Sequence, residues 1–341
     1  MSEFIITNSN MRTSLSDIPE NTIDACVTDP PYELNFQNNS WDRSGVSFQK
    51  ETWETVFRVL KPGSYAAIFG GTRTWHRIAV AVEDAGFEIR DTLMWLYGSG
   101  MPKSYNPGNK DGYEHYGGLG TSLKPAWEPI IIARRPIQGS VLNNLDTYGT
   151  GCLNIDDTRI PTTDSYVINR FDSGMKPFGN AVGETYQTYE QPDKGRWPSN
   201  LLLDEDAANG IDKISGISTS VRTDRGRGIH GRTFHSPNGT SSGVRGHNDS
   251  GGASRYFWVK KANRLEKSDA NHHPTVKPIE LMEYIVKMVV PKRGSVIDPF
   301  MGSGSTGVAA LLNDRDFIGV ELIDSYYNTA HKRLSDVFVD N

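Results

Sequence analysis

The sequence predicts an α/β protein with a doubly wound sheet and a large loop-rich insertion. Three observations support this prediction. Apolar strand-like runs alternate with amphipathic helical segments over residues 4–136, the alternation returns over residues 278–322, and the stretch between them is rich in Gly, Asn, Asp, Ser and Thr. Alternating strands and helices of this length are typical of an open sheet with helices on both faces.

The first half of the chain contains five expected strands and three expected helices. Continuous or alternating apolar runs predict the strands, and apolar residues near helical spacing, such as Trp53, Val56 and Leu60, predict the helices. Pro62-Gly63 is expected to end the second helix. The strands are expected at 4–7, 23–29, 64–70, 89–98 and 128–136, and the helices at 14–18, 48–60 and 74–87.

Regular patterns return near the C-terminus, after a long loop-rich stretch. We expect a helix at 278–290, a strand at 295–300, a helix at 306–315 and a strand at 317–322. From residue 138 to about 254 regular patterns fail, and the clearest ordered patch there is 196–204, a short strand or helix. Because structureless segments of this length are uncommon inside a compact domain, the middle is either a separate insertion domain or mobile loops. The chain divides accordingly into 1–136, 137–259 and 260–341.

Charge is distributed unevenly along the chain. The formal net charge of −5 would by itself argue against a nucleic-acid partner. Residues 221–264, however, hold nine basic and two acidic residues, a net of +7, so the remainder carries −12. This block is interleaved with aromatic residues and diluted by Gly, Ser and Asn, a composition typical of phosphate-backbone contacts, although a solvated linker is the alternative. The candidate DNA-contacting residues are Arg222, Arg225, Arg227, Arg232, Arg245, Arg255, Lys260 and Lys261.

Several classes of protein are disfavoured. Cys26 and Cys152 are the two cysteines, too few for a disulfide scaffold and suited to a reducing cytoplasm. The N-terminus lacks a basic segment followed by an apolar one, and no run of about 18 apolar residues occurs. We therefore expect a cytoplasmic protein that does not contact a membrane.

A glycine-rich turn follows the expected strand 295–300 and opens a helix. Gly302, Gly304 and Gly307 have the spacing G-x-G-x-x-G, and Glu321 ends the next strand 19 residues after Gly302. Such glycines let the backbone approach a ligand, and the downstream acid accepts hydrogen bonds from ribose hydroxyls. Too few residues follow for the second half of a dinucleotide site, and no Lys follows the glycines as in a P-loop. The turn therefore predicts a nucleoside-containing ligand other than NAD or FAD.

A second turn, Asp29-Pro30-Pro31-Tyr32, ends the expected strand 23–29 at the edge where ligands of open α/β sheets gather. The two prolines fix the backbone and leave carbonyl groups as rigid acceptors. The Asp29 carboxylate and the Pro30 carbonyl could accept both hydrogens of an exocyclic amino group, and Tyr32 could stack on the ring that carries it. The amino lone pair would then be directed at an electrophile. A plain Asp-Pro-Pro turn is the alternative.

Together the two turns resemble the amino-group DNA methyltransferases that use S-adenosylmethionine, in the permuted beta arrangement in which the catalytic tetrapeptide precedes the cofactor loop. The segments HPTVKP (273–278), DPFMGSGST (298–306) and FIGVE (317–321) are similar to the corresponding segments of that family. The resemblance covers about residues 4–136 and 270–335. It implies a Rossmann-like methyltransferase sheet, with a catalytic half in 1–136, a target-recognition region in 137–259 and a cofactor-binding half in 260–341.

The resemblance also implies roles for individual residues. The catalytic turn would be Asp29, Pro30, Pro31 and Tyr32. Phe300, Gly302, Gly304 and Ser305 would wrap the cofactor, Glu321 would hold its ribose, Thr275 and Lys277 would line its methionine end, and Asp298, Pro299 and Thr306 would belong to the same site.

The implied reaction is transfer to a flipped base by direct displacement. Cys26 lies inside an expected strand and Cys152 follows Gly151, so neither matches the thiol nucleophile of ring-carbon cytosine methylation. No Cys or carboxylate lies at zinc-ligand spacing around His272-His273, so no metal is expected. In the resembled family, Asp at the first position of the tetrapeptide favours adenine N6. Cytosine N4 methylation and a non-catalytic nucleic-acid-binding protein with this fold are the alternatives.

The expected partner is DNA, in a bacterial or phage-infected cell. The insertion and the 196–204 patch resemble phage or prophage methyltransferases in style. The same chemistry also serves restriction-modification, so a cognate restriction enzyme and a homodimer stay open as partners.

Overall fold

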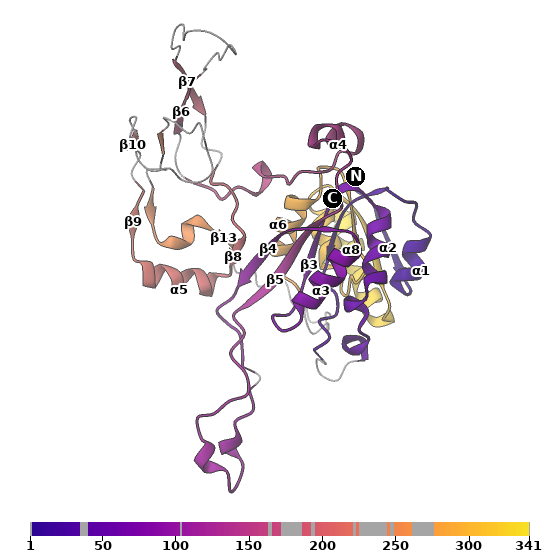
Figure 1. Ribbon diagram of the computed structural model, residues 1–341, viewed down its shortest axis with the longest axis vertical. Coiled ribbons are helices and arrows are strands. Elements are labelled where there is room, and N and C mark those ends of the chain that lie inside the picture. Colours follow the sequence, from indigo (N-terminus) through magenta and orange to yellow (C-terminus); the bar gives the residue numbers. More distant parts are fainter. Residues whose placement is uncertain are drawn as a thin grey trace.

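The protein is built on one large sheet, seen in a computed structural model that describes residues 2–34, 40–102, 104–162, 166–171, 186–191, 195–220, 223–224, 244–245, 249–260 and 276–340. The strands of this sheet are β1 (Phe4–Asn8), β2 (Ile23–Thr28), β3 (Leu60–Phe69), β4 (Glu88–Leu96), β5 (Trp127–Arg134), β8 (Leu201–Leu203), β13 (Trp258–Val259), β14 (Ser295–Asp298) and β15 (Asp316–Glu321). Their spatial order is β1-β15-β14-β2-β3-β5-β4-β8-β13 (Figure 1).

Eight of these strands run parallel, and β5 alone is antiparallel to its neighbours β3 and β4. The helices are α1 (Met11–Ser16), α2 (Lys50–Val59), α3 (Trp75–Asp84), α4 (Val141–Tyr148), α5 (Glu205–Ser215), α6 (Ile279–Val289), α7 (Ser305–Leu311) and α8 (Asp324–Asp340). Short 3-10 turns are η2 (Ser40–Arg43), η3 (Val46–Phe48), η4 (Pro107–Asn109), η5 (Glu114–Tyr116), η6 (Asp156–Thr158) and η7 (Ala253–Tyr256). The predicted α/β class with a doubly wound sheet is therefore confirmed.

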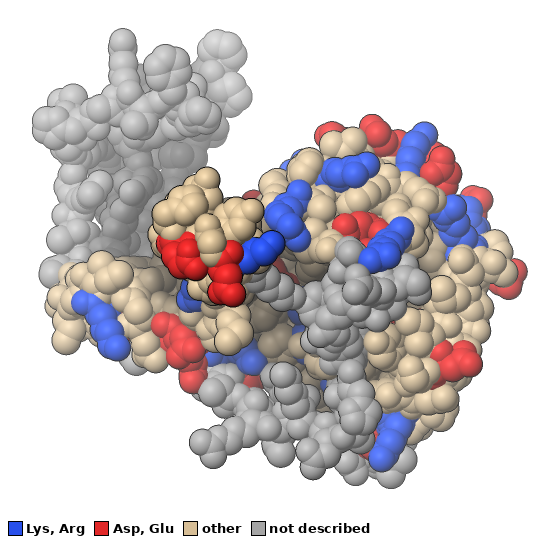
Figure 2. All heavy atoms as spheres, turned by 90° about the horizontal axis from the view of Figure 1, so that it is seen from below, with Lys and Arg blue, Asp and Glu red and all other residues tan. Residues whose placement is uncertain are grey.

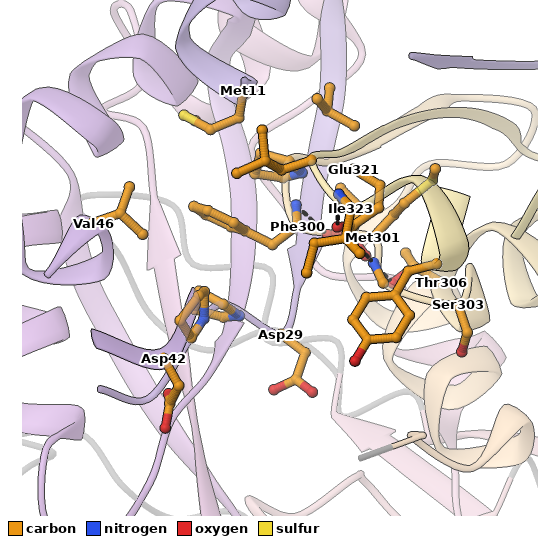
Figure 3. Close-up of a pocket in the computed structure, with 18 of the residues that line it drawn as sticks. Met11, Asp29, Asp42, Val46, Phe300, Met301, Ser303, Thr306, Glu321 and Ile323 are labelled. Atoms are coloured by element: carbon orange, nitrogen blue, oxygen red, sulfur yellow. Dashed lines mark hydrogen bonds between the residues drawn. The ribbon is translucent and has the colours of Figure 1, made fainter. Parts of the chain in front are cut away.

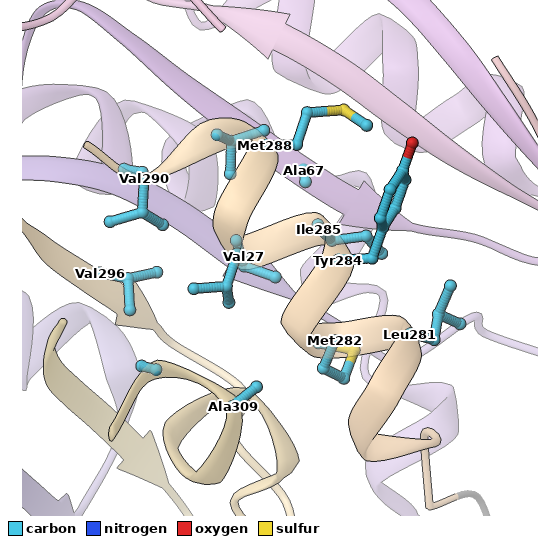
Figure 4. Close-up of a cluster of buried hydrophobic side chains, with 14 of the residues drawn as sticks. Val27, Ala67, Leu281, Met282, Tyr284, Ile285, Met288, Val290, Val296 and Ala309 are labelled. Carbon is cyan, nitrogen blue, oxygen red and sulfur yellow. The ribbon is translucent and has the colours of Figure 1, made fainter. Parts of the chain in front are cut away.

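Helices cover both faces of the sheet. Side chains of α1, α2 and α3 pack on one face with Cys26 and Ile68, and side chains of α6, α7 and α8 pack on the other with Val27 and Phe69. Figure 4 shows the second layer around α6. All six residues of β2 are buried because neighbouring side chains point to opposite faces and both faces are covered. This explains why β2 is mostly apolar on both faces.

The expected strands and helices of both halves form, with one instructive difference at β3. The sequence predicts that Pro62-Gly63 separates α2 from a strand beginning at residue 64, whereas β3 already begins at Leu60. The pairing of β2 with β3 is irregular at this place, since Ile23 pairs with Leu60 but Ala25 pairs with Tyr65. Pro62, which has no N–H to donate, is accommodated in that irregularity.

The middle of the chain is more regular than the sequence predicts. α4 and α5 were not expected, because their composition is polar, yet both have N-caps. Ser140 accepts a hydrogen bond from Asn143 N, and Asp204 accepts one from Ala207 N. The patch 196–204 contains a strand, β8, which pairs with β4 in the main sheet. The division at residues 136 and 259 stays a prediction, although β8 and β13 join the sheet of the two halves.

Three two-stranded sheets complete the description of the middle region. They pair β6 (Tyr166–Phe171) with β7 (Tyr186–Gln191), β9 (Ser218–Thr219) with β12 (Ser250–Gly251), and β10 (Thr223–Asp224) with β11 (Val244–Arg245). The connection from β4 to β5 forms a long arm that extends away from the sheet (Figure 1). Within the described ranges, no helix combines the length and hydropathy needed to cross a bilayer.

Candidate active site

Both turns singled out in the sequence lie at the same edge of the sheet. Asp29 follows β2, Asp298 ends β14 and Glu321 ends β15. These three strands are adjacent and parallel, so their carboxyl ends meet at one edge. The two turns line one cavity of about 380 Å³, whose walls include Asp29, Phe300 and Glu321 (Figure 3). Tyr32 and Gly302 also line it.

The Asp29 turn is held in place at some atoms and left open at others. The Pro31 carbonyl accepts a hydrogen bond from Ser47 Oγ, and the Tyr32 carbonyl accepts one from Thr74 Oγ1 at 2.8 Å. Among the described residues, the buried Asp29 Oδ1 has no hydrogen-bond partner, and neither has the Pro30 carbonyl. The turn therefore keeps Asp29 Oδ1 and the Pro30 carbonyl available beside the cavity, whereas the Pro31 carbonyl is already bonded. That the two acceptors receive an amino group stays a prediction.

A buried lysine forms an ion pair with the other carboxylate oxygen of Asp29. Lys277 Nζ lies 2.7 Å from Asp29 Oδ2 and 3.3 Å from Glu128 Oε2. Burial lowers the pKa of Lys277, but the carboxylates of Asp29 and Glu128 outweigh this effect and raise the pKa above its ordinary value. Lys277 is therefore an ammonium group bridging two carboxylates.

Tyr32 belongs to the same cluster. Its hydroxyl donates a hydrogen bond to Glu128 Oε2 at 3.3 Å and lies 3.2 Å from Lys277 Nζ. The Lys277 ammonium also lies 5.4 Å from the centre of the Tyr32 ring. Burial and the nearby Asp29 and Glu128 carboxylates raise the pKa of Tyr32 well above its ordinary value. Tyr32 is therefore a neutral hydrogen-bond donor at physiological pH.

The glycine turn is closed by Glu321. Gly302 N donates to Glu321 Oε2 at 2.9 Å, and Ile323 N donates to Glu321 Oε1 at 2.8 Å. Burial raises the pKa of Glu321, while these backbone hydrogen bonds oppose the increase. Each carboxylate oxygen keeps further acceptor capacity, which a hydroxyl group in the cavity could use.

Gly304 has a different place in the turn from Gly302. It caps α7 with a φ of 80°, and a Cβ atom there would lie 3.0 Å from Ala330 Cβ in α8. Gly302, with a φ of 52°, lines the cavity, whereas Gly304 does not. The helix packing thus explains why position 304 is glycine.

Asp298 is buried below the turn and connects three elements. It accepts hydrogen bonds from Thr28 Oγ1 at 2.7 Å, from Thr306 Oγ1 at 2.6 Å and from Phe300 N at 3.1 Å. Burial raises the pKa of Asp298 to about 7, although the hydrogen bonds from Thr306 and Thr28 oppose this. These contacts fix β2, β14 and α7 relative to one another. Pro299, Phe300, Ser305 and Thr306 all line the cavity.

Only some of the candidate DNA-contacting residues lie in the described part of the chain. Arg255 binds Gly251 O at 2.6 Å and Ser218 Oγ at 3.1 Å, so its guanidinium holds the middle region together. Lys260 N pairs with Leu203 O beside β13. On the face shown in Figure 2, described Lys and Arg side chains are interspersed with Asp and Glu. Outside the described residues lie Arg222, Arg225, Arg227, Arg232 and Lys261, the side chain of Arg245, and the cofactor candidate Thr275.

The sequence analysis missed several parts of the cavity wall, among them Asp42 and Val46 in the segment before α2. Glu128 lies at the start of β5, which would be the far edge of the sheet if β5 were parallel. Because β5 is antiparallel, its first residues lie beside the carboxyl ends of the other strands. The segment from Ser9 to Arg12 also lines the cavity, after β1. Its signal was available, since β1 pairs with β15 and therefore ends beside Glu321.

Comparison with known proteins assigns the sequence to a family. A family model described as DNA methylase, N6_N4_Mtase, matches residues 23–332. The chain belongs to this DNA methylase family. The S-adenosylmethionine dependence implied by its motifs agrees with that membership. Within the described residues of this methylase, no cluster of His, Cys, Asp or Glu could hold a metal ion.

Individual relatives are distant or partial. The type II methyltransferase M.HindIII of Haemophilus influenzae is 23% identical over 96% of this methylase and 94% of that protein. M2.DpnII of Streptococcus pneumoniae is 38% identical over 23% of this chain and 29% of its own. Among solved structures, the M1.HpyAVI–SAM complex aligns with a TM-score of 0.47 and 19% identity, covering 97% of this chain and 98% of the other.

Proposed function

We propose that this methylase transfers a methyl group from S-adenosylmethionine to the exocyclic N6 of adenine in DNA. The observation that carries the proposal is the buried, unbonded Oδ1 of Asp29, which lines the same cavity as the glycine turn. An unpartnered buried acceptor is costly in a folded protein, and such groups are typical of sites that receive a ligand.

The residues around the cavity fit the cofactor. Glu321 has acceptor capacity for ribose hydroxyls, Phe300 and Met11 offer apolar walls for the adenine ring, and Gly302 lets the backbone approach the ligand. When bound, S-adenosylmethionine supplies an electrophilic methyl group on sulfur. Asp29 lines the same cavity, so an amino group held by Asp29 would face the methyl group there.

The turn would prepare the target base for direct displacement. Asp29 Oδ1 and the Pro30 carbonyl accept the two amino hydrogens, and Tyr32 stacks on the base. The amino lone pair would then point at the methyl group that the cofactor supplies. After transfer, the nitrogen would lose its surplus proton to solvent. Alignment of the reacting atoms, with acceptors fixed before reaction, lowers the barrier.

No thiol takes part in this scheme. Cys26 is buried inside β2, where burial and the nearby Asp298 carboxylate raise the pKa of its thiol well above the ordinary value. Cys152 is exposed and lies outside the cavity wall. A covalent enzyme–base adduct therefore has no nucleophile at this site.

We favour adenine N6 as the target because Asp29 is the first residue of the tetrapeptide, and Asp at this position goes with adenine in the resembled family. Cytosine N4 presents the same conjugated amino group beside a ring nitrogen and is the second candidate. The test is to incubate the protein with methyl-labelled S-adenosylmethionine and unmethylated duplex DNA, digest the DNA and identify the nucleoside by mass. N6-methyladenine supports the proposal, and N4-methylcytosine replaces the base assignment. No methylated base, with cofactor binding intact, contradicts DNA methylation and favours a binding-only role.

The remaining parts of the proposal concern DNA and cellular context. We propose that the basic block 221–264 contacts the DNA backbone and that the target base is flipped into the cavity. Action on cytoplasmic DNA of a bacterium or a phage-infected cell, with or without a cognate restriction enzyme, is part of the same expectation.

A further inference from the structure

Glu128 is a carboxylate at the start of β5 that has no role in the methyl-transfer scheme above. Its side chain is 24% exposed and reaches both Lys277 Nζ and the Tyr32 hydroxyl at 3.3 Å. It lines the cavity together with Asp29. Three segments far apart in the sequence therefore meet at its carboxylate: the turn after β2, the start of β5 and the segment before α6.

The charges in this cluster do not cancel. Asp29 and Glu128 each carry a negative charge and Lys277 carries a positive one, so the cluster has a net charge of −1. With Lys277 alone, the ammonium would neutralise Asp29, and it would be free to move towards Asp29 Oδ1. In a partly buried site such charges act strongly on one another, because water screens them less than at the surface.

We propose that Glu128 is a positioning residue for methyl transfer, acting through Lys277 and Tyr32. It holds the ammonium between the two carboxylates, so that Lys277 binds Asp29 Oδ2 and leaves Oδ1 for the amino group. It also fixes the Tyr32 hydroxyl, and with it the ring that stacks on the base. This inference rests on the proposed function and extends it to a residue outside the tetrapeptide.

The net charge has a second consequence. As the N–C bond forms, the positive charge of the methyl donor passes to the base nitrogen, where it persists until the proton leaves. Because that nitrogen is the atom held by Asp29, a cluster with net charge −1 stabilises the charge there more than on the donor. Interactions that are stronger in the transition state than in the ground state raise kcat rather than lower KM. Glu128 should therefore affect kcat.

Direct binding of the cofactor by Glu128 is the competing explanation, since the carboxylate lines the cavity. The two explanations differ in what they predict for binding. A residue that acts through Lys277 and Tyr32 leaves the affinity for S-adenosylhomocysteine unchanged. A residue that contacts the ligand changes it.

The test compares Glu128→Gln with Glu88→Gln. Glu88 also forms an ion pair with a buried residue, since Arg134 Nη2 lies 2.6 Å from Glu88 Oε2. This ion pair lies at the opposite end of the same β4–β5 pair. For Glu128→Gln we expect kcat to fall at least tenfold. The KM values for DNA and cofactor, and the Kd for S-adenosylhomocysteine, should stay within about twofold of the unmodified protein. Glu88→Gln should keep kcat within about twofold.

The outcomes separate this inference from the proposed function. An active unmodified protein with unchanged kcat in Glu128→Gln overturns the positioning role. A rise in the Kd for S-adenosylhomocysteine of tenfold or more overturns it in favour of direct cofactor binding. An inactive unmodified protein that still binds S-adenosylhomocysteine overturns the proposed function itself.

Discussion

Lys277 Nζ and Asp29 Oδ2 lie 2.7 Å apart, although 248 residues separate them in the sequence. The contact joins the segment before α6 to the turn after β2, and so connects the two halves of the methylase on either side of the middle region. Sequence similarity alone implied that Lys277 lines the methionine end of the cofactor. Lys277 lines the cavity, so that role stays a prediction, and its position beside Asp29 adds the proposal that it orients this carboxylate.

Removing Lys277 should cost stability. In Lys277→Met, Asp29 and Glu128 lose their shared cation and become an uncompensated, partly buried pair of like charges. We expect the free energy of unfolding to fall by about 3 kcal/mol, as when one partner of a buried ion pair is removed. Urea unfolding followed by tryptophan fluorescence measures this change.

Two further variants show whether the loss comes from the charges. Lys287→Met removes a partly exposed lysine that pairs with Glu283 within α6, so its effect should be below about 1 kcal/mol. Adding Glu128→Gln to Lys277→Met removes one of the two repelling charges and should restore part of the loss. Equal losses in Lys277→Met and Lys287→Met would contradict the assigned ion-pair cluster.

Asp298 should make stability depend on pH. The pKa of the folded state is about 7 against an ordinary value of 3.8, so between these values the folded state holds a proton that the unfolded state has lost. The free energy of unfolding therefore decreases as the pH rises from about 4 to about 7, and this contribution is level above that range. The full shift corresponds to at most about 4 kcal/mol.

Asp298→Asn isolates this effect, because the other titrating groups are the same in both proteins. The stability of the variant relative to the unmodified protein should increase between pH 4.5 and pH 8. Urea unfolding at several pH values provides the comparison. Parallel pH profiles for the two proteins would show that Asp298 is not held protonated by burial.

Local patterns were sufficient to predict most of the fold and both turns. The apolar run of β2 and the spacing of Gly302, Gly304 and Gly307 each depend on residues close in sequence. Glu128 could not be found in this way, because its place beside Asp29 depends on the direction of β5, and a strand pattern reads the same in either direction. Likewise, the polar composition of α5 hid a helix that begins at its Asp204 cap and packs beside β8.

Gly307 is expected to be required for the packing of α7 against α8 and β15. A Cβ atom at this position would lie 2.6 Å from the Leu334 side chain and from the buried Phe317 ring. Gly307→Ala should therefore lower the free energy of unfolding by about 1–3 kcal/mol, as overpacking does. Gly210→Ala in α5 is the matched control. It meets no atom within 4 Å and should stabilise the protein by up to about 1 kcal/mol. Similar changes in both variants would contradict the packing explanation.

The basic block should determine how DNA binding depends on salt. Replacing Arg222, Arg225, Arg227 and Arg232 by Ala should weaken binding. It should also flatten the plot of log affinity against log salt by about 0.9 for each DNA phosphate that the variant no longer neutralises. Arg90→Ala, on an exposed arginine of β4, should leave the slope unchanged. Fluorescence anisotropy with labelled duplex DNA at several salt concentrations measures both slopes. An unchanged slope in the fourfold variant would make this stretch a linker.

In the proposed mechanism, Asp29 prepares the target amino group while the glycine turn binds the cofactor. The most direct test is the single-turnover rate of methyl transfer by Asp29→Ala at saturating DNA and S-adenosylmethionine, with S-adenosylhomocysteine affinity measured on the same preparation. We predict a rate at least a hundredfold below that of the unmodified protein, with affinity changed by less than about threefold, because a transition-state hydrogen bond of this kind is worth about 3 kcal/mol. An unchanged rate would contradict the assignment of Asp29 and the mechanism built on it.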